Sequence, residues 1–105
     1  HWLKDLPQLT GLELRSAKVR DPDFLDGLNP AMWALDFGHN DLTTVARFLQ
    51  FKQLRFLQLG YNHITDIDPL IQLPTLEFLG VTGNPIDVDA IDRLQRANPK
   101  LVVVY

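Results

Sequence analysis

Apolar residues recur along this chain in a single phrase. The phrase reads apolar-x-x-apolar-x-apolar-x-x-Asn-x-apolar, and it occurs at residues 32–42, 54–64 and 76–86. The three copies start 22 residues apart, and so do their asparagines. A fixed period of this size is typical of a solenoid, in which each unit buries its apolar face by stacking on its neighbours.

Looser copies of the phrase flank these three. Residues 9–19 keep the apolar spacing but carry Ala17 where Asn is expected, and Leu101 begins a fifth copy that runs to Tyr105. The terminal units of solenoids are usually atypical because they cap the stack. We therefore expect one repeat domain over residues 1–105, with about four to five repeats.

The region before the first copy keeps a related pattern. Leu3, Leu6 and Leu9 follow one another at a spacing of three, as the apolar residues do after Ile64. This indicates that a further unit, or an upstream domain, precedes residue 1, so that the sequence is a fragment of a longer chain.

Each phrase predicts a short strand followed by a turn. The alternating leucines point inward, and stacked copies form a parallel sheet. Asn40, Asn62 and Asn84 come after the strands, where their amides can bond backbone groups of their own turn and of the adjacent turn. We therefore expect a ladder of asparagines along the stack.

The segments between the phrases predict short helical returns. Apolar residues recur at a spacing of three within residues 45–54 and 67–76, which favours 3₁₀ or short helical structure. Residues 21–30 are expected to be irregular, with Leu25 and Leu28 inward. Residues 88–97 predict an α-helix that Asp87 or Asp89 caps and that Asn98-Pro99 ends.

On these residues the chain resembles leucine-rich repeat proteins. The 22-residue period is most similar to the short repeats of protein-phosphatase regulatory subunits and bacterial internalins. The resemblance covers about residues 3–105. It implies an α/β fold, with a curved parallel sheet on the concave face, 3₁₀ or short helical returns on the convex face and a C-terminal capping helix. It also implies that the concave face binds another protein.

Composition narrows the functional classes. The 105 residues carry a net charge of about −3, which disfavours a nucleic-acid partner. Apolar runs are too short to span a membrane, and the first residues lack the pattern of a signal peptide. Cysteine is absent, which excludes disulfides and zinc-thiolate sites. We expect a cytoplasmic location, although a secreted or surface protein of a bacterium would have the same composition.

Several short motifs resemble catalytic or metal-binding motifs. Each of them can be explained by its place in the repeat or on the surface, with no such function. Asp36-Phe37-Gly38 spells the magnesium-binding triplet of kinases, but Phe37 holds a leucine position of the repeat. Two acidic clusters, at residues 21–26 and 87–92, lack the glycine and glutamate of a calcium loop and are expected to cap helical turns. Ser16 has no nucleophile elbow around it. We expect no enzyme activity, no metal and no cofactor.

The residues between the inward leucines face the concave side, because side chains alternate along a strand. Stacking places equivalent positions in columns, roughly 4.8 Å apart. In this alignment Tyr105 shares a column with Asp36, Gln58 and Gly80. Aromatic residues beside Arg are typical of binding surfaces. The expected partner-binding residues are Trp33, Asp36, His39, Arg55, Phe56, Gln58, Tyr61, Glu77, Phe78 and Tyr105.

Some of these residues also have a purely structural explanation that requires no partner. Phe56 and Phe78 could pack sideways on their neighbours, His39 could be a solvated turn residue, and the glycines could serve turn geometry alone. Three functions follow. The first is a non-enzymatic module that binds a protein or peptide on the concave face. The second is the recognition domain of a larger enzyme or signalling protein. The third is a structural or self-associating repeat.

Overall fold

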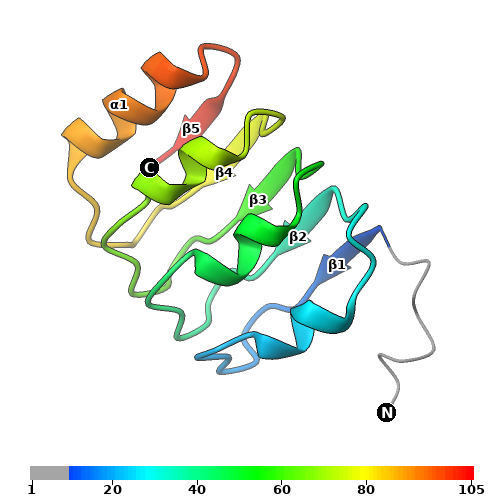
Figure 1. Cartoon of the computed structure of the whole chain (residues 1–105). Helices are drawn as coiled ribbons and strands as arrows, with labels where there is room; N and C mark the ends of the chain where they lie inside the picture. The colour runs from blue at the N-terminus through cyan, green and yellow to red at the C-terminus, as the bar shows by residue number, and fades with distance from the viewer. Residues whose placement is uncertain (1–9) are drawn as a thin grey trace.

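The computed structural model of this chain describes residues 10–105, and it shows one parallel sheet with helical segments along one of its faces (Figure 1). The sheet has five strands in sequence order. They are β1 (Gly11–Glu13), β2 (Ala34–Asp36), β3 (Phe56–Gln58), β4 (Phe78–Gly80) and β5 (Val102–Val104). The predicted solenoid is confirmed. The pattern at Leu3, Leu6 and Leu9 lies outside the described residues.

The core lies between the sheet and the helical segments. Each strand sends one leucine-type side chain inward, and the residue that follows the strand sends a second. Leu35, Leu57 and Leu79 form the first buried row, and Phe37, Leu59 and Val81 form the second. Phe37 has no exposed surface, so the central residue of the kinase-like triplet is part of the repeat core.

The asparagine ladder is present as predicted. Asn62 donates from Nδ2 to the carbonyl oxygen of Leu59 in its own turn and to that of Phe37 in the preceding repeat, each over 3.0 Å. The same arrangement recurs at the other two asparagines. Asn40 donates to the carbonyls of Phe37 and Leu14. Asn84 donates to those of Val81 and Leu59. Turn carbonyls would otherwise be buried without partners. One amide per repeat therefore joins successive turns.

Three of the returns are 3₁₀ helices, which is what their spacing of three requires. They are η2 (Asp23–Gly27), η3 (Ala46–Gln50) and η4 (Asp68–Gln72). The expectation that residues 21–30 are irregular was wrong. Leu25 donates to the carbonyl of Pro22, and Leu28 donates to that of Leu25, each over 3.0 Å. Leu25 and Leu28 are buried as predicted.

The first acidic cluster lies at the start of η2 as expected, with Asp23 and Asp26 in the first turn, but it supplies no capping hydrogen bond. No side chain caps the start of this helix. Asp21 and Asp26 instead accept hydrogen bonds from Arg47, which lies in η3 one repeat later, at 3.0 and 2.6 Å. A guanidinium carries five N–H donors and can therefore bond two carboxylates at once. This pairing ties η2 to η3 on the convex side of the molecule.

The final return is the predicted α-helix, α1 (Val88–Ala97). Asp87 caps it by accepting a hydrogen bond from the backbone of Asp89. Buried Ala90, Ile91 and Leu94 face the core, and α1 lies beside η4 on the helical side of the sheet, at the C-terminal end of the stack (Figure 1). Within residues 10–105, no helix has the length and apolar character needed to cross a membrane.

The register of β5 differs by one residue from the sequence alignment. Val102 pairs with Phe78, and Val104 pairs with Gly80. In β3 the amides of both Arg55 and Phe56 donate to one carbonyl, that of Trp33.

Before β5, only one backbone amide, that of Val102, donates to the corresponding carbonyl of the preceding repeat, that of Glu77. Leu101 donates to Asn98, as Leu76 does to Leu73, and Val102 then bonds the carbonyl of Glu77 directly. One residue is therefore omitted between the buried leucine and the strand. Placing Tyr105 in the column of Gly80 was wrong, because Val104 holds that position.

Candidate functional site

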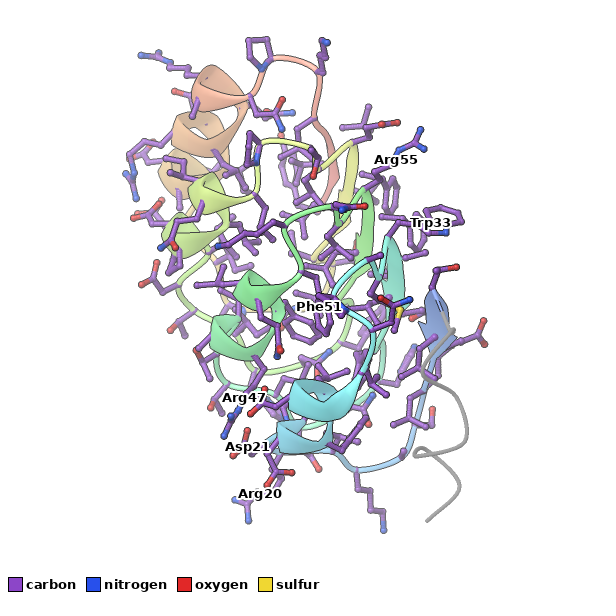
Figure 2. The ribbon with its side chains drawn as sticks, turned by 45° about the vertical axis from the view of Figure 1, so that its right-hand side comes forward. Arg20, Asp21, Trp33, Arg47, Phe51 and Arg55 are labelled. Carbon is purple, nitrogen blue, oxygen red and sulfur yellow. The ribbon has the colours of Figure 1, made fainter. Side chains whose placement is uncertain are left out.

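The concave face is the side of the sheet that points away from the helical segments. Trp33 and Arg55 project from this side, whereas Phe51 points into the core and Arg47 lies among the helical segments (Figure 2). Large exposed apolar side chains on this face include Trp33 and Tyr61, which are 47% and 53% exposed. The face carries side chains in rows that run across the strands.

The first row stands just before the strands and is called here the leading row. It consists of Trp33, Arg55 and Glu77. The Arg55 guanidinium carbon lies 6.0 Å from the centre of the Trp33 ring. Its Nε donates to Glu77 Oε2 over 2.7 Å. Three successive repeats thus contribute an aromatic ring, a cation and a carboxylate that contact one another in order.

Charge pairing shifts both ionisable groups of the leading row. The hydrogen bond from Arg55 lowers the pKa of Glu77 below its ordinary value, and the positive charge of Lys100 adds to this effect. The same hydrogen bond raises the pKa of Arg55. Both side chains are more than half exposed, so solvent weakens the attraction.

Phe56 and Phe78 form the next row, in the middle of the face. Their rings stack with centroids 4.8 Å apart and planes inclined by 9°. Both residues are half-buried. The predicted sideways packing therefore occurs, while one part of each ring still faces solvent.

Asp36 and Gln58 occupy the row beyond the phenylalanines and bond within the chain. Each accepts a hydrogen bond from the backbone two residues later, at Gly38 and at Gly60. Asp36 also pairs with Arg15 at 3.0 Å and is only 18% exposed. The amide of Gln58 lies over Gly80, where a β-carbon would collide with it. A side chain at position 80 would therefore require the Gln58 amide to move away from its bond to Gly60.

His39 and Tyr61 stand where the strands end and form the trailing row. Their rings stack with centroids 4.5 Å apart and planes inclined by 17°. Both residues have left-handed backbones, with φ of 57° and 59°. Such values are unusual for a bulky residue such as Tyr. Gly83 follows in the same row at φ 80°, and the Tyr61 ring covers it.

The structure brings seven of the ten predicted site residues together in three places along the concave face. The leading row joins Trp33, Arg55 and Glu77, the middle joins the two phenylalanines, and the trailing row joins His39 and Tyr61. Tyr105 lies one residue beyond β5 and is 67% exposed. It stands outside these rows.

Sequence reasoning missed a groove beside the leading row. Besides that row, its walls include Ala31, Gln53, Thr75, Lys100 and Val102. Four of these residues directly precede the leucine or methionine that starts each phrase: Ala31, Gln53, Thr75 and Lys100. Extending the aligned columns one position towards the N-terminus would have found them.

The described residues show no arrangement for metal chemistry. In the region 10–105, no three His, Cys, Asp or Glu side chains gather closely enough to hold a metal ion. The Asp87 carboxylate accepts a hydrogen bond from the backbone of Asp89, Asp92 pairs with Arg96, and Asp21 and Asp26 pair with Arg47. The concave face offers aromatic surface and paired charges, which suit recognition of another molecule.

Comparison with solved structures shows the same fold elsewhere. A leucine-rich repeat protein of Leptospira interrogans superposes with a TM-score of 0.79 and 26% identity over 97% of this chain. Internalin C2 of Listeria monocytogenes gives 0.78 and 26% identity over 97%. The chain spans only 26% and 43% of the length of those two proteins. The Mex67:Mtr2 structure from Chaetomium gives 0.66 and 18% identity over 93% of this chain and 80% of that one.

Comparison with protein families assigns the chain more directly. No protein with a curated description matches it in sequence. A family model described as "Leucine-rich repeat and WD repeat-containing protein 1, LRR" matches residues 3–104. Leucine-rich repeat folds are protein-interaction modules. Because the match extends over nearly the whole chain, this protein belongs to that family of leucine-rich repeats.

Proposed function

We propose that this chain is a non-enzymatic interaction module that binds a protein or peptide on its concave face. Trp33 and Tyr61 supply exposed apolar contacts, and the Phe56–Phe78 stack lies between them. Arg55 and Glu77 supply charge matching. The observation that carries the proposal is the large exposed surface of Trp33 and Tyr61 on the sheet side, since exposed aromatic patches mark interaction surfaces.

Preorganisation supports the proposal. The trailing row is held by stacking and by its turns, and the leading row is held by a cation–π contact and an ion pair. Rigid aromatic side chains lose little conformational entropy on binding. The fold therefore presents its aromatic surface at low entropic cost.

Substitution on the two faces of the molecule tests the proposal. Trp33→Arg and Phe56→Arg should abolish capture of a partner from a cell extract. Ile71→Arg is the matched control, because Ile71 is 51% exposed but belongs to η4 on the convex side. Circular dichroism verifies that each variant is folded. Undiminished capture by folded Trp33→Arg and Phe56→Arg variants would refute the concave-face assignment.

A second candidate is the recognition domain of a larger enzyme or signalling protein. It is favoured by the small share of the two bacterial relatives that this chain spans, 26% and 43%. Sequencing the full-length transcript tests it directly. A third candidate, self-association through the aromatic face, predicts a concentration-dependent dimer in sedimentation experiments.

A further inference from the structure

The groove beside the leading row differs in charge from the rest of the molecule. In the part of the chain that the structure describes, its ionisable side chains are Arg55, Glu77 and Lys100. Two cations against one carboxylate leave it with a net charge of about +1, whereas the whole chain has about −3. A local reversal of sign favours a partner of the opposite charge.

The groove contains hydrogen-bond donors of Arg55 and Lys100 that have no acceptor within the described residues. Glu77 takes hydrogen bonds from Nε and Nη2 of Arg55. Among residues 10–105, Arg55 Nη1 makes no hydrogen bond, and Lys100 makes neither a hydrogen bond nor an ion pair. Guanidinium and ammonium groups are the preferred partners of carboxylates.

Apolar surface borders these cations. Trp33 is 47% exposed and Val102 is 57% exposed, and both line the groove. The one-residue slip of β5 places Val102 in the row of Phe78. An apolar side chain of a partner can therefore rest beside its own acidic residue.

Resting on the proposed function, we infer that this groove binds an acidic segment of the partner protein. A partner carboxylate engages Arg55 and Lys100, and a neighbouring apolar side chain packs against Trp33 and Val102. A basic segment fits less well, because its cation would compete with Arg55 for Glu77, the only carboxylate among the groove residues within 10–105.

The test uses a display library of random peptides selected on the intact chain. Acidic peptides with an aromatic or aliphatic residue should be enriched. Fluorescence anisotropy of an enriched peptide then compares the wild type with Arg55→Gln, Lys100→Gln and Glu77→Gln. Arg96→Gln is the control, because Arg96 lies on α1 and is 80% exposed in its side chain.

Opposite effects of the substitutions identify the charge of the ligand. Arg55→Gln and Lys100→Gln should each weaken binding by about two- to fivefold, the range of an exposed charge pair. Glu77→Gln should strengthen binding by a similar factor, because it removes the carboxylate that repels the ligand. Arg96→Gln should leave binding unchanged.

Three outcomes would overturn the inference. Enriched peptides that are basic, or whose binding is lost in Glu77→Gln, would show that Glu77 is the recognition group. Selection that gives no peptide sensitive to Arg55→Gln would also overturn it. In each of these cases, the proposed function still holds if the peptides bind the Trp33→Arg variant less well than the wild type. Peptides insensitive to Trp33→Arg and Phe56→Arg would refute the concave-face function as well.

Discussion

Asn62 donates a hydrogen bond to the carbonyl oxygen of Phe37, which lies one repeat earlier, over 3.0 Å. Its Oδ1 accepts from the backbone amide of Leu42 in that same earlier repeat. Its Nδ2 also bonds Leu59 in its own turn. Asn62 is only 3% exposed, so water cannot replace these contacts. A single buried side chain therefore joins two turns that would otherwise have unsatisfied backbone groups.

Replacing this asparagine should destabilise the protein strongly. Asn62→Ala removes the bonds to Phe37, Leu42 and Leu59, leaving buried backbone groups unpaired, and we expect a loss of about 2–4 kcal/mol. Urea unfolding measures it. Asn29→Ala is the control, because half-buried Asn29 accepts one local bond from Ala31. An equal loss in the two variants would contradict the role assigned to the ladder.

Gly83 should tolerate no side chain. Its φ of 80° disfavours L-residues, and a β-carbon would lie 2.5 Å from Cδ1 of Tyr61. We expect Gly83→Ala to lower the free energy of unfolding by about 1–3 kcal/mol.

Two further variants separate the causes of that loss. Gly27→Ala should be nearly neutral, since no atom lies within 4 Å of the position that its β-carbon would take. Combining Gly83→Ala with Tyr61→Ala should remove the collision but retain the backbone strain. Thermal unfolding of the four proteins measures both contributions. A Gly83→Ala protein as stable as Gly27→Ala would refute the prediction.

The Arg55–Glu77 pair makes a prediction about pH. The hydrogen bond from Arg55 lowers the pKa of Glu77, so the folded state binds the proton more weakly than the unfolded state. The stabilisation is therefore present above the unfolded pKa, about 4.3, and is lost as pH falls through the lower folded pKa. Carboxyl NMR titration should show the lowered pKa in the wild type.

Substitution of the cation supplies the control for this titration. In Arg55→Gln the pKa of Glu77 should rise towards its ordinary value. Arg93→Gln should leave it unchanged, because Arg93 on α1 pairs with Asp68 on η4. A pKa of Glu77 that does not respond to Arg55→Gln would exclude the pair as the cause.

Replacing a core phenylalanine should mainly reduce stability, whereas replacing a phenylalanine of the concave face should mainly reduce binding. Phe48 has no exposed surface and packs edge-to-face on Phe37, so Phe48→Ala should cost about 3–5 kcal/mol. Phe56→Ala removes a half-buried stacked ring and should cost about 1 kcal/mol. Partner capture at a temperature where both variants are folded should fail only for Phe56→Ala. Equal stability losses would place Phe56 in the core.

Much of the fold could be predicted because the repeat encodes it locally. Asn40, Asn62 and Asn84 mark three of the turns, and the leucine spacing marks the strands β1 to β4. The first return could also have been recognised. Pro22, Leu25 and Leu28 stand at a spacing of three, as Val45, Phe48 and Phe51 do. Proline at the first of these positions hid the pattern, although only its carbonyl is needed there.

The candidate site was predicted as a surface, but its pairings were not. Alternation along a strand shows that Arg55 and Tyr61 face the concave side. It cannot show that Arg55 contacts both Trp33 and Glu77, or that Tyr61 stacks on His39. Those contacts depend on side-chain rotamers and on left-handed turns, which the spacing of apolar residues does not specify.

The sequence by itself determined the solenoid, the inward rows and the asparagine ladder, because each follows from a residue type repeated at one period. Only the tertiary structure decided the register of β5 and the groove beside the leading row. The α1 return is longer, and one residue fewer stands between Leu101 and its strand. A shift of one residue reverses which side chains face outward in a strand. Hydrogen bonding at that turn therefore turns Val103 towards the core and moves Val102 from the row of Glu77 to the row of Phe78, where it lines the groove with Lys100.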